Sequence, residues 1–237
     1  GDGELQAVAS GIMVEPRVAS TDVLRAVIAC GTGNDWIRMY GIPRTYTDSI
    51  RAIVDGHSFL QDIGRISYYK SNFQQQRYMA NVAGIGFDAA VNRKYNRLKE
   101  EGKKSKWLYI WSAFKSVLRY HSTGVKMWID DRLVINELVY SATIGIGKYN
   151  GGGMIQMPDA VADDGLFDVT VIRRISRMGV LMRFRKLYNG KIYNIKKVSL
   201  SRGRKIRIAS SPEIRVEVDG EALGYSPFEF EMLDRAI

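Results

Sequence analysis

The sequence predicts an α/β region over residues 1–60, followed by a β-sandwich-like domain with a few helices over residues 61–237. The first sixty residues alternate helical and strand patterns, which is typical of α/β folds. From residue 124 onward, many short strand patterns with frequent turn signals dominate, which is typical of a β-sandwich. Because no linker separates the regions, we place the boundary where the pattern changes, near residue 60.

The α/β region contains three predicted helices and one predicted strand. Apolar residues at helical spacing predict a helix over residues 4–14. The apolar run 25–30 predicts a strand of the kind that is buried in a parallel sheet. A glycine-containing turn then leads into a helix over residues 36–40, and Thr47 and Asp48 are expected to cap a helix that continues to Val54.

The second region is predicted to contain mainly strands. Residues 65–69 and 77–83 are expected to pair around a polar turn at Ser71 and Asn72. Helices are predicted over residues 87–98, 106–120 and 176–188. The remaining predicted strands are residues 125–129, 133–146, 167–172, 195–201, 205–209, 214–218 and 228–232.

Composition excludes several classes of protein. The chain has 237 residues, of which 46% are hydrophobic and 25% charged, so intrinsic disorder is excluded as its main state. A single cysteine, Cys30, excludes a disulfide scaffold and indicates a reducing compartment. No apolar run approaches the roughly 20 residues that cross a bilayer. We therefore expect a cytoplasmic protein.

The net charge of +10 favours a polyanionic partner, although ordinary surface charge explains it equally well. Nucleic acid is excluded as a partner, because the chain lacks a nucleic-acid-binding motif or an interleaved aromatic pattern. The charge remains compatible with nucleotide phosphates or an anionic membrane surface.

Two glycine-containing turns precede helices and could hold phosphate groups. Glycines let the backbone approach a ligand, and the first amides of the following helix favour an anion. Taken singly, each turn is better explained as a tight turn of an α/β unit. The candidate residues in these turns are Gly1, Asp2, Gly3, Thr32, Asn34 and Asp35.

Two acidic turns could carry further chemistry. Asp163 and Asp164 precede Gly165, and carboxylates with free carbonyls in a tight turn can bind a hard cation. Spacing alone favours a solvated turn before the next strand over a cation site. Asp219 and Glu221 flank Gly220, where the Asp-Gly pair is also a common hairpin signal.

In combination, these motifs resemble the catalytic region of the diacylglycerol kinase and sphingosine kinase superfamily, with the bacterial soluble lipid kinases as the closest type. The resemblance extends over nearly the whole chain, in the order of the family. Its motifs are residues 1–3 (Gly-Asp-Gly), 31–35 (Gly-Thr-Gly-Asn-Asp), 41–43, 81–88, 151–154 (Gly-Gly-Gly-Met), 164–166 (Asp-Gly-Leu) and 219–221 (Asp-Gly-Glu).

The resemblance implies an NAD-kinase-like α/β nucleotide-binding domain, present here as its C-terminal portion, joined to a β-sandwich domain. It implies ATP at the two glycine turns and a lipid alcohol between the domains. Glu221 would accept the proton of the lipid hydroxyl, with Asp219 beside it. The structural Mg²⁺ that the family binds would be held by Asp164 and by the main-chain oxygens of Val161 and Leu166.

Three positions depart from the family pattern. Glu4 stands where the family usually has threonine, Gln6 replaces a common asparagine and Ala7 replaces an acidic residue. The chain also begins without methionine, so we expect a fragment that is inactive alone. The prediction is an ATP-dependent lipid kinase. A non-catalytic lipid-binding protein of the same fold and, ranked lower, an NAD kinase-type enzyme are the alternatives.

Two basic clusters are candidates for peripheral docking on the anionic inner face of a membrane. The first is Lys94, Arg97, Lys99, Lys103, Lys104 and Lys106, beside the aromatic residues Trp107, Tyr109 and Trp111. The second is Arg173, Arg174, Arg177, Arg183, Arg185 and Lys186. The alternative for the first cluster is the wet face of a helix whose aromatic residues face the core. The identity of the lipid and the formation of a homodimer are left open.

Overall fold

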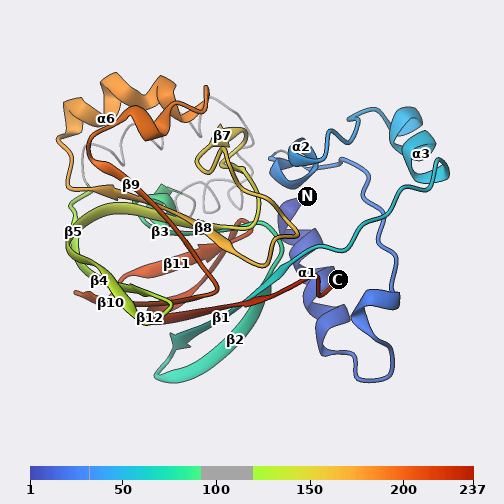
Figure 1. Ribbon diagram of the computed structural model, residues 1–237, viewed down its shortest axis with the longest axis horizontal. Helices are drawn as coiled ribbons and strands as arrows, with labels where there is room; N and C mark the ends of the chain where they lie inside the picture. Colours follow the sequence, from blue (N-terminus) through green and yellow to red (C-terminus); the bar gives the residue numbers. More distant parts are fainter. Residues whose placement is uncertain (32, 92–119) are drawn as a thin grey trace.

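The structure is a computed structural model of the chain, and it describes residues 1–31, 33–91 and 120–237. The strands form a closed β-structure, and the helices α1, α2 and α3 lie together beside one end of it (Figure 1). This arrangement confirms the predicted fold class, a mixed α/β chain whose larger part is a β-sandwich with few helices.

Amphipathic spacing explains the first helix. Helix α1 (Asp2–Val14) confirms the prediction for residues 4–14 and buries Leu5 and Ala9 against the strand side of the molecule. The buried Gln6 side chain donates a hydrogen bond of 2.7 Å to the carbonyl of Tyr78, so the helix is tied to a strand as well as packed on it. The other helical elements of this region are η1 (Ser20–Asp22), α2 (Asp35–Met39) and α3 (Tyr46–Val54).

Two details of the α/β region differ from the prediction. Residues 25–30 form no strand, and none of the described strands pairs with them. Since a strand is stable only when its backbone groups are paired by a neighbour, an apolar run alone does not produce one. The cap of α3 is Thr45, whose hydroxyl accepts the Asp48 amide at 3.3 Å, two residues before the predicted cap.

The sandwich is one sheet that closes on itself, because β10 pairs with both β4 and β12. Its order is β10-β4-β5-β3-β11-β12-β1-β2, with β8 joining β5 to β9. The strands are β1 (Ile63–Lys70), β2 (Phe73–Met79), β3 (Val82–Gly86), β4 (Thr123–Ile129), β5 (Arg132–Gly145), β8 (Phe167–Arg173), β9 (Val198–Gly203), β10 (Lys205–Ser211), β11 (Arg215–Val218) and β12 (Glu221–Leu233), with a separate pair of β6 (Tyr149–Asn150) and β7 (Met154–Ile155).

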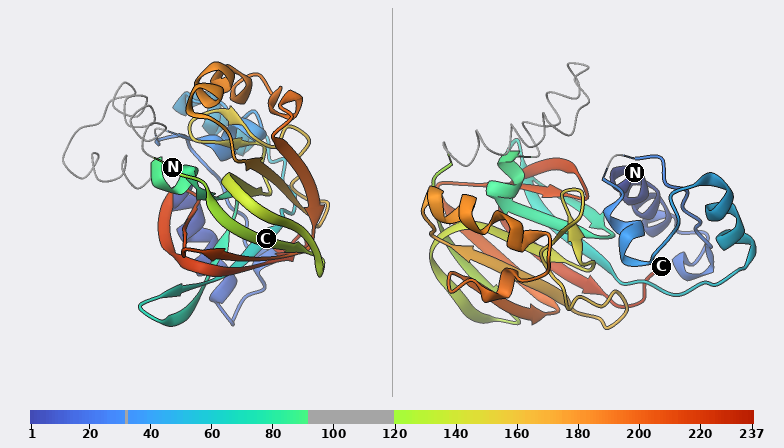
Figure 2. Two further views of the ribbon diagram at one scale, coloured as in Figure 1. Left: turned by 90° about the vertical axis from the view of Figure 1, so that its left-hand side faces the viewer. Right: turned by 90° about the horizontal axis from the view of Figure 1, so that it is seen from above.

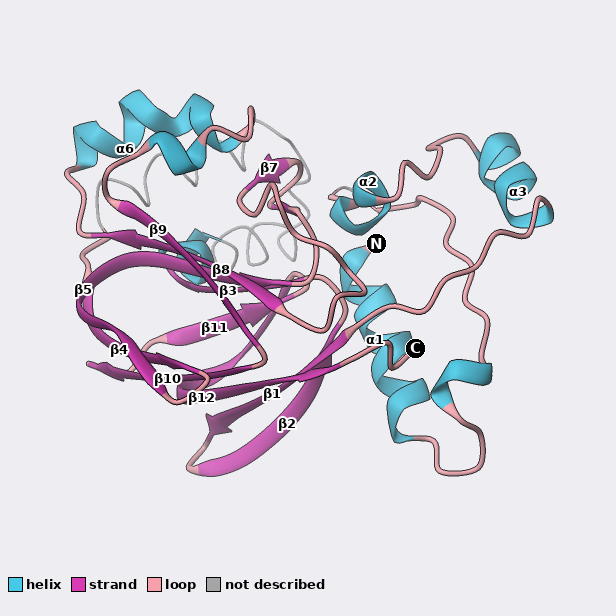
Figure 3. Ribbon diagram, viewed as in Figure 1, coloured by secondary structure: helices cyan, strands magenta, loops and turns pink. Residues whose placement is uncertain are grey.

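The interior of the sandwich is apolar. Its largest fully buried side chains include Phe167, Phe228 and Phe230, and the two on β12, Phe228 and Phe230, alternate with exposed residues along that strand. The predicted hairpin turn at Ser71 and Asn72 is confirmed, and both residues have a positive φ that suits a tight two-residue turn. Figure 3 shows that strands dominate after the first three helices.

Several predicted boundaries are wrong. Residues 77–83 belong to two strands, since β2 ends at Met79 and β3 begins at Val82. The helix predicted over residues 176–188 is divided into α6 (Arg177–Arg183) and η2 (Phe184–Leu187), and η3 (Ile192–Asn194) follows. Residues 87–91 are helical, whereas residues 92–119, with the first basic cluster and its aromatic residues, lie outside the described part.

Helix α6 covers the outer face of the sheet near β8 and β9, on the side away from β10 and β12 (Figures 1 and 2). Among the described residues, no helix combines the length and the apolar character that crossing a bilayer demands.

Candidate active site

The second glycine turn packs against the beginning of α1. A Cβ atom at Gly31 would lie 2.6 Å from the Cα of Gly1 and 2.7 Å from the Oδ1 of Asn34. Contacts this short cannot be made by a real side chain, so glycine is required for the two backbones to approach. The two turns that the sequence singled out are therefore neighbours. Thr32, the predicted nucleotide contact in the second turn, lies outside the described residues.

Asp2 and Asn34 hold this arrangement together. The two carboxylate oxygens of Asp2 accept the backbone N–H groups of Asp35, at 3.1 Å, and Trp36, at 3.0 Å, and so cap the first turn of α2. Asn34 has a φ of 52° and closes the loop, donating to the Gly31 carbonyl and accepting the Gly31 amide. Both side chains thus position the loop, and their predicted contact with a cofactor stays a prediction.

Asp35 joins this loop to the third glycine motif. Its Oδ2 accepts the backbone N–H of Gly152 at 2.7 Å, and its Oδ1 lies 3.4 Å from the Nε of Arg38. Burial raises the pKa of Asp35 above its ordinary value, while the Gly152 amide and the Arg38 charge oppose that rise. The contact connects residues that are 117 positions apart in the chain.

Asp219 is buried at the end of β11 and organises the turn before Glu221. Its carboxylate accepts three backbone amides, those of Ala80 at 2.8 Å, Asn81 at 3.1 Å and Val82 at 2.8 Å. Burial raises its pKa to about 7, and these three hydrogen bonds act against the rise. Because both oxygens are engaged, Asp219 fixes the backbone here and is a positioning residue.

Glu221 follows at the first position of β12, and its side chain is exposed. A Cβ atom placed on Gly3 would lie 3.2 Å from the Glu221 Oε1, so the carboxylate reaches the first turn of α1. The structure therefore brings together the two glycine turns and Glu221, although they come from opposite ends of the chain.

The predicted magnesium site contains an ion pair. Asp164 pairs through Oδ2 with Arg202, and its Oδ1 accepts the Leu166 amide at 3.1 Å. The carboxylate and the carbonyl oxygens of Val161 and Leu166 are donors of the type that Mg²⁺ prefers. A cation bound at Asp164 would have to displace the Arg202 guanidinium, so the residues as arranged do not fit it.

A cavity with apolar walls lies between α6 and the sheet, with about 800 Å³ of empty space including its open mouth. Asn150 and Gly151 line it, and the next residue, Gly152, is the one that contacts Asp35. The cavity thus begins beside the glycine turns. Its apolar walls include Phe87, Val91, Ile172, Val180, Phe184 and Leu187.

A buried polar cluster lines one side of this cavity, and sequence reasoning assigned it no role. Asp88 accepts hydrogen bonds from Thr143, at 3.0 Å, and Gln156, at 3.4 Å, and burial raises its pKa. The sequence signal that could have pointed to Asp88 is the Gly-Ile-Gly-Phe-Asp run at residues 84–88. A buried carboxyl group beside apolar walls offers a hydrogen-bonding partner to a mostly apolar ligand.

Two family models match the chain. One, described as the YegS C-terminal NAD kinase beta sandwich-like domain, matches residues 81–237, and the other, the diacylglycerol kinase catalytic domain, matches residues 1–66. The chain belongs to the diacylglycerol kinase family. The resemblance inferred from the glycine and acidic motifs is thereby confirmed.

Relatives from the diacylglycerol kinase family match most of the chain. A diacylglycerol kinase from Mycobacterium tuberculosis is 28% identical over 221 residues, covering 93% of this chain and 70% of that protein. One from Staphylococcus epidermidis is 26% identical over 239 residues, covering 100% and 71%. A solved diacylglycerol kinase structure from Bacillus anthracis has a TM-score of 0.70 at 18% identity, covering 100% of this chain and 72% of that one. This likeness shows a shared fold.

Proposed function

We propose that this diacylglycerol kinase family member transfers the terminal phosphate of ATP to the hydroxyl group of a lipid alcohol. The observation that supports the proposal best is the hydrogen bond from Gly152 to Asp35. It joins the glycine turns, which suit phosphate groups, to the mouth of a cavity whose walls suit hydrocarbon. A nucleotide and a lipid held at these two places would meet beside Glu221.

The nucleotide phosphates are assigned to the two glycine turns. Glycine at Gly31 and Gly1 lets the second glycine turn pack against the N-terminus of α1, and the first amides of a helix favour an anion. Mg²⁺ bound to ATP would neutralise part of the triphosphate charge. The remaining work for the protein is to position the reactants, since phosphoryl transfer needs little covalent chemistry.

In the proposed reaction, Glu221 acts on the acceptor. The lipid hydroxyl oxygen forms a bond to the γ-phosphorus, and the bond from that phosphorus to the β–γ bridging oxygen breaks. The hydroxyl proton passes to the Glu221 carboxylate, and the bond electrons leave with ADP. A carboxylate within hydrogen-bond reach of an alcohol is the ordinary general base for this step.

The acyl part of the acceptor is assigned to the cavity beneath α6. The named relatives make diacylglycerol the first candidate, and a sphingoid base is the second. Asp88 would face the polar part of the lipid that enters the cavity.

Filling the cavity is expected to affect long-chain acceptors selectively. Val180→Trp places a larger side chain in a wall of the cavity, so the KM for a long-chain lipid should rise about 10-fold or more, as expected when about 1.4 kcal/mol of binding is lost. Kinetics with dioleoyl- and dibutyryl-glycerol in neutral detergent micelles measure the effect. Val134→Trp, at an exposed position of β5, is the matched control. An equal effect on both acceptors would contradict the assignment.

The function itself is tested by incubating the complete protein with labelled ATP and a panel of lipid alcohols. Phosphorylated lipid is the expected product. Lipid binding without transfer to any member of the panel would instead favour a non-catalytic lipid-binding protein, an alternative that Glu4, which differs from the family's usual residue, keeps open.

A further inference from the structure

A second groove lies on the flank of α6 and is strongly basic. It is formed by the residue stretch before α6, the end of α6 with η2, and residues 194–197. None of the residues that line the groove is a carboxylate. Its five cationic side chains are Arg174, Arg183, Lys186, Lys196 and Lys197.

These charges are not neutralised by ion pairs within the described part of the chain. Arg183 donates to the Gly179 carbonyl at 3.2 Å and Lys186 to the Asn194 carbonyl at 3.4 Å, so both remain cationic donors to neutral groups. Arg173, just outside the groove, provides the contrast, because its Nε lies 2.7 Å from the Oε1 of Glu137. The groove therefore carries positive charge that no described carboxylate neutralises, whereas Arg173 on the adjoining sheet is paired with Glu137.

Two apolar side chains of α6 are strongly exposed beside its arginines. Met178 and Met182 are four residues apart, so they lie on one side of the helix, and they are 62% and 69% exposed. Large apolar side chains beside a cluster of basic residues are typical of a helix that lies in a membrane interface. The rest of the described chain therefore leaves most of each methionine side chain exposed.

The groove and the apolar cavity share a wall. Ile175, Arg183 and Ile195 line both. A membrane bound at the groove would therefore lie next to the apolar cavity, where a hydrocarbon chain could enter the protein.

We propose that α6 and residues 194–197 form a docking surface for an anionic phospholipid bilayer. Lys196, Lys197 and the neighbouring cations bind the phosphate groups of the lipids, and Met178 and Met182 enter the interface. The surface then places the cavity mouth against the membrane that contains the acceptor. This last point rests on the proposed function, whereas the docking itself does not.

Sedimentation with vesicles tests the docking without ATP. The protein is expected to bind vesicles of equal parts phosphatidylglycerol and phosphatidylcholine, and to bind pure phosphatidylcholine much more weakly. Lys196→Glu with Lys197→Glu should weaken binding to the anionic vesicles by about 30-fold or more, given the usual contribution of each lysine near such a surface. Met178→Ser with Met182→Ser should weaken the binding that persists at 0.5 M salt.

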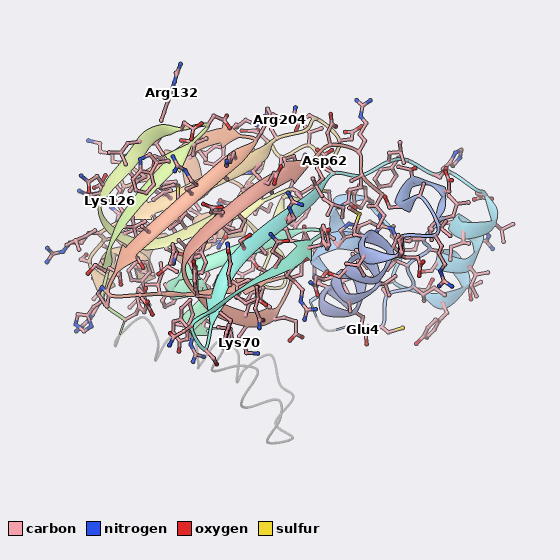
Figure 4. All side chains as sticks on the ribbon, turned by 90° about the horizontal axis from the view of Figure 1, so that it is seen from below. Glu4, Asp62, Lys70, Lys126, Arg132 and Arg204 are labelled. Carbon is pink, nitrogen blue, oxygen red and sulfur yellow. The ribbon has the colours of Figure 1, made fainter. Side chains whose placement is uncertain are left out.

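The matched control is Lys126→Glu with Lys205→Glu, which changes the net charge by the same amount on strands β4 and β10. These strands lie on the side opposite α6, where Figure 4 labels Lys126. Binding by this control should change less than 3-fold. Equal losses in the two pairs would overturn the proposal, as would equal binding to neutral and anionic vesicles.

Two further measurements separate the sources of failure. Glycerol 1-phosphate at 10 mM should not displace the protein from vesicles, and displacement would indicate a pocket for a free phosphate ester instead. In neutral detergent micelles, Lys196→Glu with Lys197→Glu should phosphorylate lipid as fast as the unmodified protein. Loss of micelle activity in this variant would overturn the docking proposal, whereas inactivity of the unmodified protein would count against the proposed function alone.

Discussion

Replacing Glu221 by glutamine is expected to lower kcat for lipid phosphorylation by about 10²–10⁴-fold, the usual contribution of a general base. Glutamine keeps the size of the side chain and removes its ability to accept the hydroxyl proton. Glu221 is exposed at the beginning of β12, so the change should leave the unfolding free energy within about 0.5 kcal/mol of its original value. Steady-state kinetics with saturating ATP and lipid measure the effect.

The matched control is Glu229→Gln. Glu229 is exposed on the same strand, where it pairs with Ser67 of β1 and Arg207 of β10 and not with either glycine turn. It should leave kcat unchanged. Binding of ATP to the Glu221→Gln variant, measured by calorimetry, should remain within a few-fold of the original affinity. Retained turnover in Glu221→Gln would remove this residue from its proposed role.

Asp219→Ala is expected to lower the free energy of unfolding by about 4 kcal/mol, because each hydrogen bond to a charged group contributes about 1.5–3 kcal/mol and its loss leaves a buried donor unpaired. Three backbone amides, at residues 80–82, would lose their acceptor in this variant. The same amides connect the start of β3 to the turn before Glu221, so activity should fall together with stability.

Urea denaturation followed by tryptophan fluorescence measures this loss, and Asp55→Ala, at the exposed end of α3, is the control that should change little. Asp219→Asn keeps the shape and one acceptor oxygen, so its stability should lie between those of the alanine variant and the unmodified protein. A loss below 1 kcal/mol in Asp219→Ala would contradict the positioning role.

Local features of the fold could be predicted from the sequence because neighbouring residues decide them. The apolar spacing from Leu5 to Met13 is sufficient to define α1, whose register depends only on residues three and four apart. The turn at Ser71 and Asn72 follows from residues that tolerate a positive φ. The prediction of a strand over residues 25–30 was wrong, because a strand forms only where a neighbouring strand pairs with it.

The sequence also identified the residues that surround the candidate site, but not their partners. Asp2, Asp164 and Asp219 are all carboxylates beside glycines, and the neighbouring residues do not reveal which donors they bind. The structure gives them three different partners: the first amides of α2, the Arg202 guanidinium, and the amides of residues 80–82. The residue type fixes what a side chain can accept, whereas the fold decides which donor lies within 3 Å.

By itself, then, the sequence determined the order of most described helices and strands, the glycine turns and the excess of positive charge. Only the tertiary structure decided that Asp35 meets Gly152, that an apolar cavity opens beside that contact, and that five cations gather on the flank of α6. The physical reason is that periodicity and turn preference depend on residues a few positions apart. Cavities and charged grooves are formed by side chains from distant segments, which meet only when the sheet closes.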